Sequence, residues 1–119
     1  MNPTTLEQTK RAMIEQEPHW YVAFMDFVDE FRRTRDVARF AEPWPLDHPR
    51  YDALLASTLE YLCDEAGIEP PAWSWEIPAC PDPWFVAGVE NLKALALVQS
   101  PAHFRRRKIF VLENFLARV

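Results

Sequence analysis

Glycine and proline are used in this chain in a way that restricts its fold more than any other feature. The 119 residues contain only two glycines but eleven prolines. Tight β-hairpin turns usually need glycine, whereas proline stiffens loops and cannot continue the interior of a helix. The prolines gather in clusters between long segments that lack them. We therefore predict a mainly α-helical fold, a bundle of about four to five helices joined by loops rich in proline and tryptophan.

The size and composition of the chain predict a single helical domain over residues 1–119. A mass of 14.0 kDa fits one domain, and 49% hydrophobic with 13% aromatic residues suffices for a packed core. The first residues lack the basic region and apolar core of a secretion signal, and no apolar stretch reaches the ~20 residues of a membrane span. We expect a cytoplasmic protein that does not contact membranes.

Three helices follow from the spacing of apolar residues. We predict the first over residues 4–16 and the second from Pro18 to about Asp36. A third helix should begin at Asp47 as its N-cap and end at Gly67. Its predicted buried stripe is Tyr51, Leu54, Leu55, Thr58, Leu59, Leu62 and Cys63. On the opposite face we expect Glu60, Asp64 and Glu65 to be solvated.

The last third of the chain predicts shorter elements. Asp82-Pro83 has the pattern of a helix start, with Phe85, Val89, Leu92 and Ala96 as the buried face of a fourth helix. Ser100-Pro101 repeats that pattern and should cap a short helix that carries Phe104. Residues 109–111 are β-branched and aromatic, which predicts a short extended segment. Residues 113–119 could add a terminal helical turn or two.

Four consecutive cations, Arg105, Arg106, Arg107 and Lys108, make the most conspicuous polar feature. The whole chain carries −5, and its last 17 residues carry +4 (five Lys/Arg against one Glu), so residues 1–102 carry −9. The cluster could bind phosphates, pair with acids of the chain or of a second subunit, or bind an acidic protein. Since Ile109 and Val111 should turn inward, we expect Arg106 or Arg107 to pair internally.

Tryptophans in stiff loops are the second candidate site. Trp44 lies between two prolines, Trp73 and Trp75 follow Pro70-Pro71, and Trp84 follows Pro83. Rigid aromatic side chains are typical anchors of protein interfaces. The same side chains could instead cover the ends of the helical bundle. We retain Trp44, Trp73, Trp75 and Trp84, together with the four cations, as candidate partner-binding residues.

No constellation of residues predicts a reaction. His19, His48 and His103 are not spaced as metal ligands with other ligand-type residues, and Cys63 and Cys80 have neither the number nor the spacing of a zinc site. Two glycines cannot make a glycine-rich phosphate loop. We therefore expect a protein that is not an enzyme and that uses no metal or cofactor.

Residues 50–119 resemble a group of small bacterial proteins. The shared features are a tryptophan-containing loop (Trp73 or Trp75 here), the sequence Pro83-Trp84-Phe85, and a Ser-Pro-x-x-Phe-Arg-Arg-Arg-x-Ile-Phe-Val segment from Ser100 to Val111. The resemblance is to antitoxin-like components of toxin–antitoxin and related defence loci, which implies a non-enzymatic protein-binding module.

The partner implied by this resemblance is another protein, such as a toxin, and a homodimer is a further expectation. The alternative is a nucleic-acid-binding transcriptional regulator that uses the cluster from Arg105 to Lys108. A helix-turn-helix is not evident, because three prolines interrupt the connection between the second and third predicted helices. Nucleic acid is therefore the less favoured partner.

Overall fold

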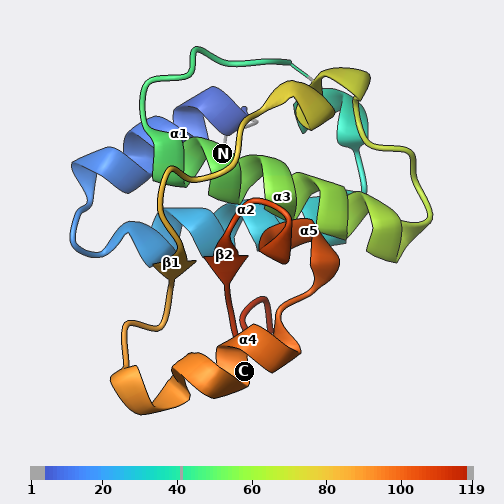
Figure 1. Ribbon diagram of the computed structural model, residues 1–119. Helices are drawn as coiled ribbons and strands as arrows, with labels where there is room; N and C mark the ends of the chain where they lie inside the picture. The colour runs from blue at the N-terminus through green and yellow to red at the C-terminus, as the bar shows by residue number, and fades with distance from the viewer. Residues whose placement is uncertain (1–4, 41, 118–119) are drawn as a thin grey trace.

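The computed structural model describes residues 5–40 and 42–117, and these residues form a mainly α-helical fold (Figure 1). The described part contains α1 (Leu6–Glu15), α2 (Trp20–Thr34), α3 (Pro49–Ala66), α4 (Lys93–Gln99) and α5 (Ala102–Arg105). Two short strands, β1 (Trp84–Phe85) and β2 (Ile109–Phe110), pair in parallel. Short 3-10 helices occupy Val37–Phe40, Ala72–Glu76 and Glu90–Leu92. The predicted fold class is confirmed.

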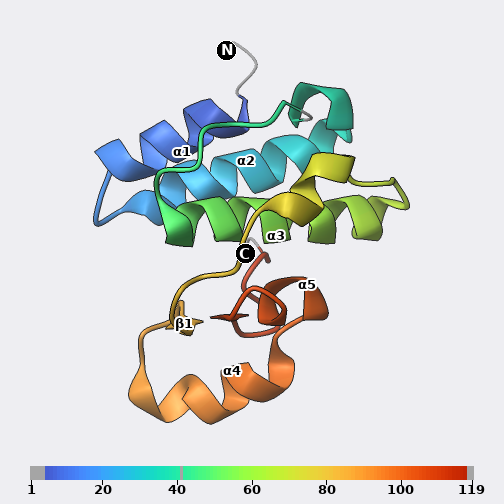
Figure 2. The same cartoon turned by 45° about the horizontal axis from the view of Figure 1, so that its top comes forward.

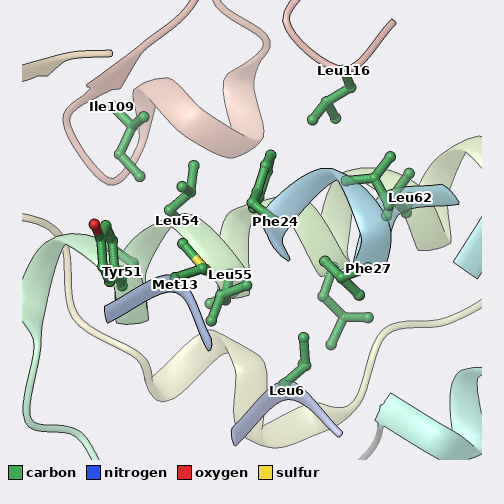
Figure 3. Packing of buried hydrophobic residues seen from close by; sticks show 14 of the residues in the cluster. Leu6, Met13, Phe24, Phe27, Tyr51, Leu54, Leu55, Leu62, Ile109 and Leu116 are labelled. Carbon is green, nitrogen blue, oxygen red and sulfur yellow. The ribbon is translucent and has the colours of Figure 1, made fainter. Parts of the chain in front are cut away.

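The core lies between the three long helices and the C-terminal segment that packs on α3. Figure 3 shows Phe24 and Phe27 of α2 with Leu54, Leu55 and Leu62 of α3 in one cluster. Ile109 of β2, in the C-terminal segment, joins the same cluster. Burial of each such side chain contributes ~1.5–3 kcal/mol. The predicted stripe of α3, from Tyr51 to Cys63, is confirmed as buried.

The predicted solvent face of α3 is wrong at one position. Asp64 and Glu65 are exposed, as expected, but Glu60 is only 1% exposed. The reason is that α3 is covered on several sides, by α1 and α2, by α5, and by the 3-10 helix Ala72–Glu76 (Figure 2). A helix in this position has no broad solvated face.

The predicted start of α3 differs by one residue. His48, not Asp47, is the N-cap, and its Nδ1 accepts the Tyr51 N–H at 3.3 Å. Asp47 is instead bound by Lys10 at 2.5 Å, and this hydrogen bond holds the pKa of the Asp47 carboxyl below its usual value. The end of the helix is as predicted, with Gly67 at φ 72° as the C-cap.

A buried polar cluster fixes the proline-rich loop before α3. The Lys10 ammonium donates to Asp52 Oδ1 at 2.9 Å and to the Pro45 carbonyl at 2.6 Å. The indole of Trp44 donates to the same carboxylate oxygen at 2.8 Å. Each buried charge therefore has a partner, as a buried charge requires.

The helix predicted from Asp82-Pro83 is wrong, because this segment is extended. The Trp84 N–H donates to the Lys108 carbonyl at 2.8 Å, and the Val86 N–H donates to the Phe110 carbonyl at 3.2 Å. Helix α4 begins only at Lys93, and of the predicted inner face only Ala96 is buried. Among the described residues, no helix is both long and apolar enough to cross a membrane.

Ser100 is not the predicted N-cap of the short helix α5, which has no side-chain cap. The buried Ser100 hydroxyl donates to the Ala96 carbonyl at 2.8 Å and accepts the Val111 N–H at 2.7 Å. It therefore joins the end of α4 to the residue after β2. The extended segment at residues 109–111 is confirmed in β2, with Ile109 and Val111 buried. Residues 113–116 form a turn rather than a helix, and residues 118–119 lie outside the described residues.

Candidate protein-interaction surface

A buried carboxylate on α3 organises the candidate site. Glu60 accepts hydrogen bonds from Arg107 at 2.5 and 3.1 Å, and a further one from Arg106. Arg107 is 3% exposed and also donates to the Ser74 carbonyl at 2.7 Å and the Ile77 carbonyl at 3.1 Å. The Arg107 guanidinium therefore joins α3 and the loop that follows α3, which contains Ser74 and Ile77, to the segment after α5. The expectation that Arg106 or Arg107 pairs internally is confirmed.

The chain after α5 turns sharply enough to leave Arg106 exposed while Arg107 is buried. The Arg107 N–H donates to the Phe104 carbonyl, and the Lys108 N–H donates to the Arg105 carbonyl, each at 3.0 Å. Lys108 has φ 63°, a left-handed conformation that reverses the chain before β2. Arg107 is consequently carried inward with Ile109, whereas Arg106 remains at the surface.

Arg106 stacks on Trp75 at the surface. Its guanidinium carbon lies 4.4 Å from the centroid of the indole ring. Trp75 is 56% exposed, and the side chain of Arg106 is 45% exposed. A cation–π contact at an exposed site contributes ~0.5–1 kcal/mol. Because Glu60 also accepts a hydrogen bond from this guanidinium, both exposed side chains have a defined position.

A hollow with an acidic lining lies next to this pair. It has a volume of about 340 Å³ and is lined by Glu60, Asp64, Gly67, Ile68, Glu69, Pro70, Trp75 and His103. The imidazole Nε2 of His103 lies 3.5 Å from Asp64 Oδ2. We call Trp75, Arg106, Asp64, Glu69 and His103 the tryptophan–arginine surface.

The other candidate tryptophans are less exposed. Trp44 is 5% exposed and contacts Trp73 edge-on, with 5.2 Å between ring centroids. Trp84 is half-buried and packs on Trp20, with 5.8 Å between ring centroids. Trp75 is therefore the predicted tryptophan that the structure places best for contact with a partner.

The four consecutive cations differ in exposure and in their partners. Arg105 is exposed, and its guanidinium donates to the Ser100 carbonyl at 2.7 Å. Lys108 is also exposed, and Arg107 is buried. The structure thus brings Trp75 and Arg106 together, and Arg106 shares the Glu60 carboxylate with buried Arg107.

Sequence reasoning missed two features of this molecule. The first is Glu60, because a helical periodicity does not reveal which cation will cover a helix from outside. The second is α4, whose apolar residues Leu95, Leu97 and Val98 are exposed. The uncharged run of residues 94–98 is a signal that could have singled out α4, although such a run ordinarily indicates burial.

The described residues contain no group of three or more His, Cys, Asp or Glu side chains that could hold a metal ion. Cys63 and Cys80 are both buried and free. Burial, with a smaller contribution from Glu60, raises the pKa of the Cys63 thiol to about 11. Burial also raises the pKa of Cys80. Both thiols are therefore neutral at physiological pH and weakly nucleophilic.

No protein-family model matches the chain, and no curated protein or solved structure is significantly similar to it. The chemistry of the tryptophan–arginine surface is therefore the basis of the function proposed below.

Proposed function

We propose that this protein is a non-enzymatic binding module that docks on another protein through the tryptophan–arginine surface. In this proposal it is the antitoxin-like or regulatory member of a bacterial toxin–antitoxin or defence pair. The observation that carries the proposal is the stacking of exposed Arg106 on exposed Trp75, 4.4 Å from the guanidinium carbon to the ring centroid.

Tryptophan and arginine are the residue types that most often dominate binding energy at protein interfaces. Binding normally costs ~0.5–1.5 kcal/mol for each flexible side chain that becomes ordered. Here Glu60 accepts a hydrogen bond from Arg106 in the free protein, so much of that cost is already met. Trp75 lies in a 3-10 helix between prolines, which restricts its backbone as well.

The charges around the pair favour a basic partner. Asp64 and Glu69 are exposed on the rim of the hollow, and residues 1–102 together carry −9. A toxin that acts on nucleic acid presents a basic surface, and complementary charge accelerates association with such a surface. An acidic module of this kind could cover the basic active site of the toxin.

The test uses the product of the gene adjacent to the one that encodes this chain. We expect the wild-type chain to bind that product in a calorimetric titration and to relieve its toxicity on co-expression. Trp75→Ala should weaken binding by roughly tenfold or more. Val22→Ala is the matched control, because Val22 is also exposed but lies on α2. Equal affinities for Trp75→Ala and wild type, or no binding at all, would reject the proposal.

Nucleic-acid binding through the cluster from Arg105 to Lys108 is the alternative proposal. Exposed Arg105 and Lys108 favour it, whereas the burial of Arg107 against Glu60 removes one cation from any phosphate contact. Fluorescence anisotropy with labelled duplex DNA at about 150 mM salt tests it. Tight binding that is lost in the Arg105→Ala/Lys108→Ala double variant would make this alternative the better explanation.

A further inference from the structure

Helix α4 presents an apolar face that nothing covers in the part of the chain that the structure describes. Ala94, Leu95, Leu97 and Val98 are all exposed, and the exposed fraction of Val98 reaches 77%. Only Ala96 of this helix is buried. Both views place α4 at the edge of the molecule, beyond the strands and away from α1, α2 and α3 (Figures 1 and 2). A second molecule could therefore approach this face freely.

The exposed residues form one continuous face rather than scattered positions. At 100° per residue, Leu97, Ala94, Val98 and Leu95 follow one another around an arc of about 160°. None of them is charged, and buried Ala96 lies on the opposite side of the helix. An apolar helix face is normally buried, so a contiguous exposed one marks an interaction surface.

We propose that α4 packs antiparallel against α4 of a second copy of this chain, around a twofold axis. In such an interface the same face meets itself. An uncharged face meets no electrostatic penalty in doing so. The basic partner inferred for the tryptophan–arginine surface would find no carboxylate among residues 93–99. The α4 face therefore suits a second copy better than it suits that partner.

The charges at the two ends of α4 select the antiparallel orientation. Lys93 is its first residue, and it pairs with Glu90 at 2.9 Å. Glu113 lies beside its last residue, because the Glu113 N–H donates to Gln99 Oε1 at 3.0 Å. In an antiparallel pair, Lys93 of each copy approaches Glu113 of the other. In a parallel pair, the Glu113 side chains of the two copies would approach each other instead, which is unfavourable.

The orientation also predicts the register. With the axis at the level of Ala96, Val98 of each copy lies opposite Ala94 of the other, and Leu95 lies opposite Leu97. A large side chain then packs against a small one, which allows a close approach of the two helices.

The first experiment measures mass in solution by analytical ultracentrifugation of the full chain alone. We expect a concentration-dependent dimer at about 100 μM and at least a tenfold weaker association for Val98→Glu. Leu46→Glu is the matched control, because Leu46 is an exposed apolar residue in the loop before α3. A wild-type chain that stays monomeric, or equal effects of the two variants, would overturn the proposal.

The second experiment tests the register by disulfide cross-linking. Native Cys63 and Cys80 are buried and should not interfere. An oxidised mixture of Ala94→Cys and Val98→Cys chains should give a covalent dimer that contains one of each, whereas either variant alone should give little. Efficient cross-linking of Val98→Cys with itself would indicate a parallel pair, and no cross-linking in the mixture would reject the interface. Neither experiment involves the partner of the proposed function, so the two proposals can fail separately.

Discussion

The three long helices and the segment from residue 72 to residue 117 bury their apolar residues to different extents. In α2 and α3, the stripes that include Phe24, Phe27 and Leu59 are fully enclosed. The later segment inserts Phe104 and Ile109 into the core but leaves Leu97 and Val98 exposed. It is also held on α3 by the buried ion pair of Arg107 with Glu60. A region attached in this way keeps a contiguous apolar helix face exposed, whereas most large apolar residues of the three long helices are buried, with Ile14, Tyr21 and Val22 as exposed exceptions.

Removal of the Glu60 carboxylate should have the largest effect on this attachment. We expect Glu60→Ala to lower the free energy of unfolding by ~3–5 kcal/mol, because Arg107 would remain buried without an anion. Equilibrium unfolding in urea, followed by circular dichroism, measures the change. Glu69→Ala is the control, since Glu69 is exposed and should alter stability by no more than about 0.5 kcal/mol. A loss below about 1 kcal/mol for Glu60→Ala would mean that Arg107 turns to solvent.

Truncation of one leucine in each region compares how much each side chain contributes to stability. Leu59→Ala in α3 should cost ~2–5 kcal/mol, because it leaves a cavity in the enclosed core. Leu97→Ala in α4 should change stability by about 0.5 kcal/mol or less, because that side chain already faces solvent. Melting temperatures at low protein concentration make the comparison without a contribution from self-association. An unchanged value for Leu59→Ala would show that α3 is less enclosed than the structure indicates.

Thiol labelling has the smallest expected effect on the native protein, because it needs no substitution. Cys63 lies in α3, whereas Cys80 lies in the later segment, where its N–H donates to the Arg107 carbonyl at 3.0 Å. If that segment opens locally, Cys80 should be modified faster than Cys63, which needs the core to open. Alkylation in native buffer, with mass spectrometry of the two peptides, gives both rates, and a fully denatured sample supplies the reference. Equal native rates would indicate a single cooperative unit.

The same thiols imply a dependence on alkaline pH. The pKa of Cys63 is about 11 in the folded chain against an ordinary value of 9.0. Between these values the unfolded thiol has lost its proton and the folded thiol retains it, so stability falls as the pH rises. This contribution is fully present below about pH 9. Urea unfolding of wild type and Cys63→Ala across this range tests the sign, and a wild-type chain that loses no more stability than the variant would contradict it.

Local patterns predicted the long helices well and the short elements poorly. A stripe such as that of α3 repeats over many turns, so errors at single positions matter little. The pattern at Asp82-Pro83 was misleading, since Trp84 and Val86 bond to a strand about 25 residues later in the chain. A local helix-capping pattern does not show whether the segment will pair with a strand far along the chain. Ser100 misled for the same reason, because its hydroxyl accepts the Val111 N–H rather than capping α5.

The candidate surface likewise combines features that the sequence predicted with features that only the tertiary structure shows. Sequence alone determined the helical class, from two glycines and eleven prolines, and it indicated that an arginine before Ile109 would turn inward, from the alternation of an extended segment. Only the tertiary structure decided that Arg107 reaches Glu60, that Arg106 lies on Trp75, and that no described residue covers the apolar face of α4. Alternation and helical periodicity depend on neighbours along the chain. The pairing of a buried charge and the cover of a helix face depend instead on which distant segments the packed core brings together.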